Sequence, residues 1–382
     1  MNSKKKILIF IDWFTPGYKA GGPVSSVVNL IENLSQEFEF MIITTDCEYL
    51  ETLPYSNIES DKWTDFNENV KIFYAKKTEL SVKKIKKVVE NIEFDTAYIN
   101  GIYSFYFSIL PLYILKNKQK KIIVASRGML SSQAFTAKSF KKKLYLNTVK
   151  FLGLYKNCIF QATNIEEAKE IEALKLGMKE IIIVSNLSKK IINDSIIKTE
   201  KIKGKLALVS IARISKEKNT KFALEVLTNY KYEGEIIFDL YGSIYDKSFW
   251  EECLEIIKNL PKNIIVNYCD TIESNKVLET FSKYHFSFMP SAGENFGHSL
   301  LESMIAGTPI ITSQNTPWRN LEQKNAGWDI ELENKEMFSE IIQKCIDLQD
   351  FEYFEMSKKT FDFAKENSNN IETINKTKQL FS

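Results

Sequence analysis

Histidine and cysteine are scarce in this chain of 382 residues. The only histidines are His285 and His298, and even the closest two of the five cysteines, Cys253 and Cys269, are too far apart for a short metal-binding motif. This scarcity excludes a disulfide framework, a cysteine zinc motif and a metal site with several histidines. We therefore expect any chemistry to depend on other side chains.

Long apolar runs are missing as well. Only five apolar residues separate the N-terminal lysines from Asp12, and the longest apolar stretch, 105–115, contains Ser108 and Pro111. A signal-peptide core needs about 7–15 apolar residues, and a membrane span needs about 20. We expect a soluble chain in a reducing cytoplasm, with association at the cytoplasmic face of a membrane as a further option.

Acidic residues are few in one region of an otherwise ordinary globular composition. Hydrophobic residues make up 44% of the chain and charged residues 26%, and the net charge is +2. Residues 70–160, however, contain 18 Lys and Arg against 4 Asp and Glu. Something anionic is expected to contact that region.

Short β-branched runs alternate with helical patterns, which favours parallel α/β sheets. The pattern runs through residue 187, pauses in a polar, lysine-rich stretch, and restarts at 206. We predict an α/β protein of two Rossmann-like, doubly wound domains that face a central cleft. The first domain comprises 1–187, completed by a C-terminal helix at 363–382, and the second comprises 188–362.

The first predicted βα loop ends in Gly21, Gly22 and Pro23. Two glycines and a proline at a helix start let backbone amides approach an oxyanion such as a phosphate. A flexible loop with a proline start is an equally good interpretation. The sequence G-x-G-x-x-G is absent, which disfavours a dinucleotide-binding dehydrogenase.

Two further βα loops contain charged residues. Arg213 and Lys218 follow the first strand of the second domain, where they could neutralise a diphosphate. Glu294 lies in a later loop, and Glu302 lies inside the helix predicted at 298–306, where a carboxylate could bind a sugar diol. The alternatives are a solvated lysine-rich loop and an ordinary acidic residue in the first turn of a helix.

Taken together, these residues resemble a known family. Arg213 with Lys218, then Glu294-x-Phe296-Gly297, Glu302 after seven intervening residues, and Gly307-x-Pro309 are similar to family 4 of the retaining glycosyltransferases, also described as glycosyl transferases group 1. The resemblance extends to Gly21, Gly22 and Asn186. It implies a GT-B fold whose second domain holds a nucleotide sugar.

The resemblance also implies site residues. Arg213, Lys218 and Glu294 would be catalytic, the two cations as a diphosphate clamp and the acid against the donor sugar. The residues implied in donor binding are Gly21, Gly22, Phe296, Gly297, His298, Ser299 and Glu302, with Glu302 on the ribose. No Asp-x-Asp occurs, so we expect neither metal nor cofactor.

The chain departs from the family pattern at two places. Asn219 stands where many relatives have glycine, which we expect to be tolerated. The N-domain loop at 126–129 has no histidine, which leaves Arg127 as the candidate on the acceptor side.

We predict a retaining, metal-independent hexosyltransferase that moves a sugar from a uridine diphosphate sugar to a glycan or lipid-linked acceptor. Its products would be cell-surface polysaccharides such as lipopolysaccharide or capsule.

Partners would include an anionic membrane but not nucleic acid. The membrane would be contacted by the basic region where lysines alternate with aromatic residues, for example Lys138–Tyr155. A solvated lysine-rich face is the alternative there. A nucleotide-sugar epimerase, a phosphorylase or a non-catalytic scaffold of the same architecture are the competing functions.

Overall fold

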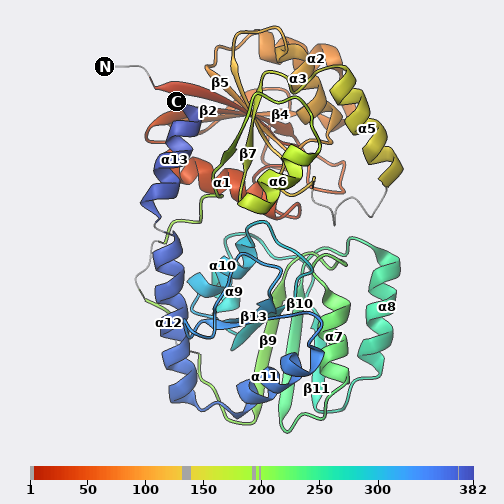
Figure 1. Ribbon diagram of the computed structural model, residues 1–382, viewed down its shortest axis with the longest axis vertical. Helices are drawn as coiled ribbons and strands as arrows, with labels where there is room; N and C mark the ends of the chain where they lie inside the picture. The colour runs from red at the N-terminus through yellow and green to blue at the C-terminus, as the bar shows by residue number, and fades with distance from the viewer. Residues whose placement is uncertain (1–3, 131–138, 192–194, 198, 369) are drawn as a thin grey trace. The chain divides into compact units, whose positions relative to one another are not determined.

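The computed structural model describes residues 4–130, 139–191, 195–197, 199–368 and 370–382 (Figure 1). The chain divides into two compact units. Unit 1 comprises 1–187 together with 370–382, and unit 2 comprises 188–369. Each has its own sheet and its own buried core, so each is described by itself.

Unit 1 is built on an eight-stranded sheet in the order β3-β4-β2-β1-β5-β6-β7-β8. All neighbours are parallel except β3 and β4, which are antiparallel. The strands are β1 (Lys5–Phe10), β2 (Phe38–Thr45), β3 (Trp63–Asn67), β4 (Val70–Ala75), β5 (Thr96–Asn100), β6 (Lys121–Ala125), β7 (Cys158–Ala162) and β8 (Glu180–Ile183).

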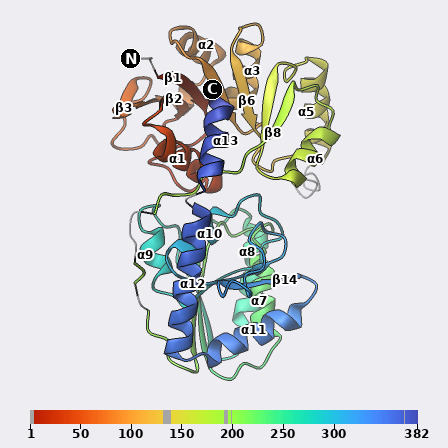
Figure 2. The same cartoon turned by 60° about the vertical axis from the view of Figure 1, so that its left-hand side comes forward.

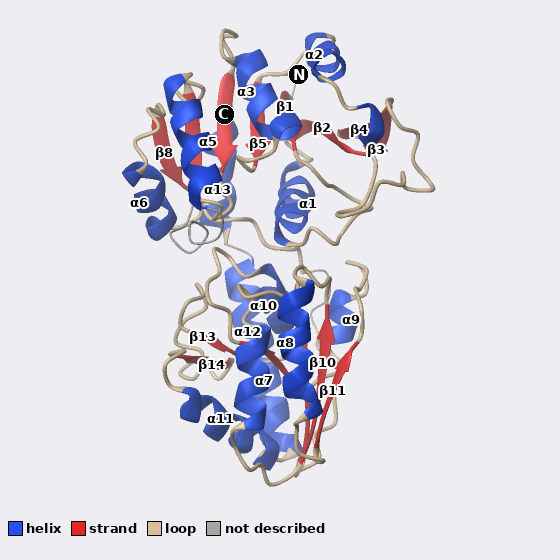
Figure 3. Ribbon diagram, turned by 90° about the vertical axis from the view of Figure 1, so that its right-hand side faces the viewer, coloured by secondary structure: helices blue, strands red, loops and turns tan. Residues whose placement is uncertain are grey.

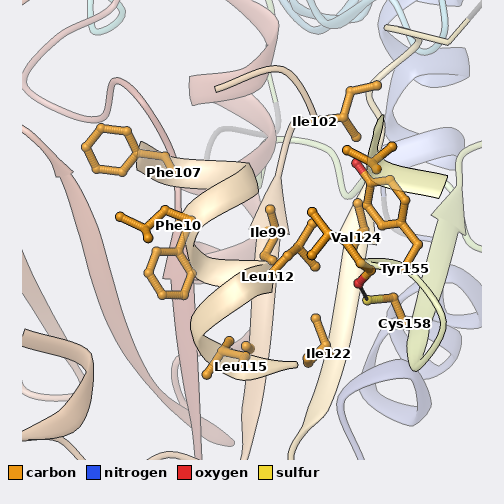
Figure 4. Close-up of a cluster of buried hydrophobic side chains, with 14 of the residues drawn as sticks. Phe10, Ile99, Ile102, Phe107, Leu112, Leu115, Ile122, Val124, Tyr155 and Cys158 are labelled. Atoms are coloured by element: carbon orange, nitrogen blue, oxygen red, sulfur yellow. Dashed lines mark hydrogen bonds between the residues drawn. The ribbon is translucent and has the colours of Figure 1, made fainter. Parts of the chain in front are cut away.

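Both faces of this sheet are buried, as the near-continuous apolar runs of its strands require. Ile7 and Ile9 of β1 pack with α1 (Gly22–Leu34) and the final helix α13 (Ile371–Phe381) on one face. Leu8 and Phe10 point to the other face, into a cluster that also includes side chains of α3 (Leu110–Leu115) (Figure 4). The same face is covered by α2 (Val82–Glu90), α5 (Ser139–Phe151) and α6 (Ile165–Ala173).

Unit 2 has a six-stranded, all-parallel sheet in the order β11-β10-β9-β12-β13-β14 (Figure 3). Its strands are β9 (Lys205–Ile211), β10 (Glu235–Tyr241), β11 (Ile264–Tyr268), β12 (Phe286–Met289), β13 (Ile310–Ser313) and β14 (Gly327–Ile330). Its helices are α7 (Thr220–Thr228), α8 (Lys247–Lys258), α9 (Val277–Phe281), α10 (His298–Ile305), α11 (Lys335–Asp347) and α12 (Asp350–Ser368). Helices α7, α8 and α11 pack on one face of the sheet, and α9 and α10 pack on the other.

In each sheet the order of strands reverses direction once. In unit 1 the chain proceeds outward from β1 to β2 and β4, then returns to β5 on the other side of β1. In unit 2 it proceeds from β9 to β10 and β11, then returns to β12 on the other side of β9. Loops after the two central strands diverge there, and ligands of open α/β sheets bind at such switch points.

The predicted fold class, two doubly wound α/β units, is confirmed. Two short strands, β3 and β14, were not predicted. The predicted domain limit at 362 is wrong, because α12 continues unbroken to Ser368 and packs within unit 2. Only the helix that begins at Ile371 completes unit 1 (Figure 2). Within the described residues, no helix is long and apolar enough to cross a membrane.

Candidate functional site

The loops that follow β9 and β12 meet at the switch point of unit 2. The amide of Ala292 donates to the carbonyl of Glu217 across 2.8 Å. Beside this contact, the ammonium of Lys218 forms an ion pair with the Oε1 atom of Glu294, and both side chains are largely buried. Two residues predicted to act together, 76 positions apart in sequence, are thereby in direct contact.

Only one of the two carboxylate oxygens of Glu294 has partners among the described residues. Its Oε1 atom also accepts a hydrogen bond of 2.8 Å from the hydroxyl of Ser291, a residue with no exposed surface. Its amide donates to the carbonyl of Asn315 at 3.0 Å. The other carboxylate oxygen, Oε2, has no hydrogen-bond partner among the described residues. This arrangement fixes the carboxylate and leaves one oxygen for a ligand.

Arg213 begins the same loop as Lys218 and is one-third exposed. Its guanidinium lies 3.5 Å from a carboxylate oxygen of Glu217 and 5.6 Å from the ring centre of Tyr245. Tyr245 follows β10, and its amide donates to the carbonyl of Ile214 at 3.3 Å. The arginine is therefore oriented by a carboxylate and an aromatic face while part of it stays open to solvent.

The loop before α10 depends on Gly297. Its φ of 74° lies in the left-handed region, and a Cβ atom there would approach the indole nitrogen of Trp318 to 3.0 Å. On either side, the rings of Phe296 and His298 lie 4.5 Å apart. The hydroxyl of Ser299 then donates to the carbonyl of Ile211 at 2.5 Å, which ties the start of α10 to the end of β9.

Glu302 lies one turn into α10, and burial raises the pKa of its carboxyl group to about 7, an effect partly offset by the ammonium of Lys189. Its carboxylate has no hydrogen bond or ion pair among the described residues. The apolar side of the helix is buried as predicted, in the cluster of Leu300, Leu301, Met304 and Ile305. A carboxylate held without partners in a low-dielectric setting is suited to accept hydrogen bonds from a ligand.

Asn219 begins α7 with a φ of 58°. Left-handed backbone favours glycine first and asparagine next. The departure from the family pattern at this position is thus tolerated, as predicted.

Sequence reasoning missed one residue at the switch point of unit 1. Asp12 lies two residues after β1, and its carboxylate accepts a hydrogen bond of 2.6 Å from Ser104, which lies beyond β5 on the other side of the switch. Burial raises the pKa of the Asp12 carboxyl group, and the Ser104 hydroxyl opposes that rise. The signal available in the sequence was a lone acid directly after a buried strand.

Gly21 and Gly22 open α1 as predicted. Gly21 has φ 70° and ψ −131°, a combination that residues with a Cβ atom avoid, although a Cβ atom there would meet nothing within 4 Å. No side chain caps this helix start.

Arg127, the predicted acceptor-side residue, has all of its guanidinium nitrogens engaged inside unit 1. They donate to Asn100 at 2.6 Å, to the hydroxyl of Tyr98 at 2.6 Å and to Asn186. This arrangement fits a residue that holds the end of β5 to the segment before the unit boundary.

The buried carboxylate of Glu167 fixes the loop that contains Arg127. The carboxylate of Glu167 accepts hydrogen bonds from the hydroxyl of Ser126 at 2.6 Å and the amide of Gly128 at 2.8 Å. It also accepts two from Thr163. Four donors satisfy both oxygens, so Glu167 has a structural role.

The structure thus brings Lys218 and Glu294 into contact, with Arg213 on the same loop as Lys218, and places Glu302 in the helix that follows Glu294. Gly21, Gly22 and Arg127 lie in unit 1. Within the described residues, no group of three or more histidine, cysteine or acidic side chains is arranged to hold a metal ion.

Comparison with known proteins shows what the chain is similar to. A family model described as glycosyl transferases group 1 matches residues 191–366. A Klebsiella pneumoniae protein, described as an uncharacterized 41.2 kDa protein in the cps region, is 23% identical over 242 residues. That alignment covers 60% of this chain and 63% of the relative, so the chain spans less than two thirds of its length.

Solved structures are similar over almost the whole chain. Sucrose-phosphate synthase from Thermosynechococcus elongatus has a TM-score of 0.71 at 13% identity, covering 99% of this chain and 98% of that one. HepE of Anabaena, in complex with UDP and glucose, has a TM-score of 0.69 at 12% identity, covering 98% of both chains. WaaG, a glycosyltransferase involved in lipopolysaccharide biosynthesis, has a TM-score of 0.62 at 11% identity, covering 99% of both chains.

At such low identities these structures establish the architecture, which is that of the GT-B fold. The family match covers nearly all of unit 2, which contains the ion pair at the switch point. Residues 191–366 of unit 2 therefore match the glycosyl transferases group 1 family, and the chain has a GT-B fold.

Proposed function

We propose that this protein is a retaining glycosyltransferase that moves a sugar from a uridine diphosphate sugar to a glycan or lipid-linked acceptor of a cell-surface polysaccharide. The observation that carries the proposal is the contact between Lys218 and Glu294 across the switch point, with Arg213 on the same loop. The two cations of this loop provide charge for a diphosphate, and the Glu294 carboxylate paired with Lys218 keeps one oxygen to accept a hydrogen bond from a sugar.

Relatives support the donor and the product class. HepE has been solved with UDP and with UDP-glucose, and WaaG is involved in lipopolysaccharide biosynthesis. The Klebsiella relative is described as lying in a cps region. These descriptions favour a uridine nucleotide and a polysaccharide product.

Each charged residue of unit 2 has a distinct role in this proposal. Arg213 and Lys218 neutralise the diphosphate, and the three N–H donors of the lysine let it bind a phosphate oxygen without leaving Glu294. The free Oε2 atom of Glu294 accepts from a hydroxyl of the donor sugar. Glu302 accepts from the ribose diol.

The chemical step follows from these roles. The bond between the anomeric carbon and the β-phosphate oxygen breaks, and the acceptor oxygen forms its bond on the same face of the sugar. The acceptor proton passes to the departing phosphate oxygen, so no enzymic nucleophile is needed. The protein's contribution is to stabilise negative charge as it develops on the leaving group. We propose that this stabilisation needs no metal.

Unit 1 supplies the acceptor side in this proposal. Asp12 provides a carboxylate at the switch point of that sheet. Gly21 and Gly22, by contrast, provide backbone amides at the start of α1 for the phosphates of the donor. Arg127 acts through the loop that it holds rather than by touching the acceptor.

The test is a panel of nucleotide sugars incubated with the full-length protein, with release of the nucleoside diphosphate and the products both measured. We expect slow hydrolysis of one or a few UDP-sugars without added metal, with an α-configured product from an α-configured donor. Isomerisation of the donor would identify an epimerase, and phosphate-dependent release of a sugar phosphate would identify a phosphorylase. Absence of any nucleotide binding by calorimetry would instead indicate a non-catalytic scaffold.

A further inference from the structure

One long segment of unit 1 contains no acidic residue. Between Thr96 and Ile165 the sequence has eleven Lys and Arg and not a single Asp or Glu. Charge of one sign over such a length cannot be neutralised by neighbours in sequence. It creates a positive potential that attracts an anionic partner.

Helix α5 and its C-terminal turn lie within this segment (Figure 1). They expose large apolar side chains. Phe151 is 90% exposed, Leu144 is 58% exposed and Leu152 is 44% exposed. Leu144 and Phe151 are seven positions apart, which puts them on one stripe of the helix. The opposite stripe is buried, with Leu146 and Val149 in the core of unit 1.

Lysines flank the exposed stripe. Lys143 and Lys150 are also seven positions apart and share the adjacent stripe of α5. Lys116, at the end of α3, donates to the carbonyl of Leu152 at 2.7 Å, which brings a third ammonium to the same place. None of the three forms an ion pair within the described part of the chain. Lys138, which belongs to the same basic run, lies outside the described residues.

We propose that this α5 surface, formed by Leu144, Phe151 and Leu152 with Lys116, Lys143 and Lys150, docks on an anionic lipid bilayer. The lysines would contact lipid phosphates while the apolar side chains enter the boundary of the hydrocarbon. Charge alone would equally suit a nucleic acid or an acidic protein. The combination of exposed Phe151 with Leu144 and Leu152 favours lipid, because the hydrocarbon boundary of a bilayer can bury all three side chains, whereas nucleobases would stack on the ring but not cover the leucines.

This inference goes beyond the transferase chemistry and does not rest on it. None of the α5 surface residues belongs to the proposed donor or acceptor site. A variant that loses lipid binding should therefore still hydrolyse a UDP-sugar in solution, and a failure of one proposal is distinguishable from a failure of the other.

The experiment is flotation of the full-length protein with vesicles of neutral phosphatidylcholine, and with vesicles that contain 30 mole per cent phosphatidylglycerol. We expect recovery on the anionic vesicles alone, falling steeply with added salt because the Debye length shrinks from about 8 Å at 0.15 M to about 3 Å at 1 M. Phe151→Ser should weaken partitioning by about tenfold, since one buried phenylalanine side chain contributes at least that much. Each of Lys143→Gln and Lys150→Gln should weaken it by about fivefold.

Phe351 provides the matched control. It is 75% exposed on α12 of unit 2, between two acidic residues, so Phe351→Ser should leave partitioning unchanged. Equal recovery on neutral and anionic vesicles would overturn the proposal. So would equal loss in the Phe151 and Phe351 variants, or retention on a DNA matrix that vesicles do not compete away.

Discussion

Lys218 and Glu294 form an ion pair across the point where the strand order of unit 2 reverses, and Ser291 donates to the same carboxylate oxygen. The pair links the first loop of the unit to its fourth. The ammonium of Lys218 keeps further N–H donors, and Glu294 keeps its Oε2 atom as an acceptor. The contact therefore offers a ligand both hydrogen-bond donors and an acceptor at one place. That relationship leads to the first two predictions.

Removing either cation should slow transfer. Arg213→Ala and Lys218→Ala should each lower kcat by about 10²-fold, the usual loss when one stabiliser of developing charge is removed. Steady-state release of UDP from the preferred donor measures this. Lys221→Ala is the control, because Lys221 forms a surface ion pair of 2.6 Å with Glu252 and should retain full turnover. If both clamp variants turn over at the wild-type rate, the diphosphate assignment is wrong.

Ser291 should act as a positioning residue for Glu294. Ser291→Ala removes a hydrogen bond to a charged group, and we expect kcat to fall about tenfold while KM for the donor changes little. Ser303→Ala is a matched control, since Ser303 is equally buried and its hydroxyl donates to the carbonyl of Thr308 at 2.8 Å, away from the carboxylate. Both variants should lose stability to a similar extent. An unchanged kcat in Ser291→Ala would remove the positioning role.

Glu302 should make donor binding depend on pH. With a pKa of about 7, its carboxyl group is about one-tenth ionised at pH 6 and about nine-tenths ionised at pH 8. A carboxylate accepts from a diol better than a neutral carboxyl does, so affinity for UDP-glucose should rise by up to about tenfold over that interval. Calorimetric titration measures it, and Glu302→Gln should bind weakly with no such dependence. UDP-glucose has no phosphate that titrates in this range.

The same residue should cost the unliganded protein stability. Its folded pKa of about 7 lies above the unfolded value of 4.5, so its contribution is most favourable below pH 4.5 and is lost as pH rises to 7 and beyond. Above pH 7 the penalty reaches at most about 3 kcal/mol. Glu302→Gln should therefore raise the melting temperature at pH 8 and have little effect at pH 4.5. A variant that melts lower than wild type at pH 8 would contradict this.

His285 should destabilise the protein in acid. Burial lowers the pKa of its imidazole from 6.5 to about 4. The neutral ring accepts from the amide of Ala207 at 2.9 Å and donates to the carbonyl of Glu200 at 2.9 Å. Because the folded pKa is depressed, the stabilisation is complete above pH 6.5 and is lost as pH falls toward 4, by up to about 3 kcal/mol.

Denaturant titrations between pH 7 and pH 4 measure this slope. His285→Gln keeps a donor and an acceptor without a titrating group, so its stability should fall less with acid than that of the wild type. Identical slopes in the two proteins would show that His285 is not the titrating group.

The sequence predicts those parts of the site that depend on residues close together in the chain, such as the glycines and prolines that bound a helix. Helix α10 is bounded by glycines and a proline, so its limits and the place of Glu302 follow from spacing alone. Strands β3 and β14 lie at sheet edges and were missed because neither is a continuous apolar run. Trp63–Asn67 is largely polar, and Gly327–Ile330 contains Gly327 and Asp329. Contacts between loops after non-consecutive strands depend on strand order, which a single sequence does not show.

The contacts of Arg127 are a second example of what a single sequence does not show. Arg127 is the candidate because its loop is where many relatives have a histidine, and its acceptor-side role stays a prediction. The sequence does not indicate that its nitrogens donate to Tyr98 and Asn100 of β5 and to Asn186, partners from two separate stretches of chain. Likewise, Asp12 and Ser104 are 92 positions apart, and only the order of β1 and β5 brings them together.

The return of α13 to unit 1 affects how the protein can be divided and made. Leu380 and Phe381 are almost fully buried against that unit, with the ring of Phe381 5.9 Å from Phe38 and 5.4 Å from Tyr98. A recombinant fragment that stops at Leu187 would leave this aromatic surface bare. During synthesis, unit 1 therefore cannot complete this part of its core until α13, which follows unit 2 in the chain, has been made.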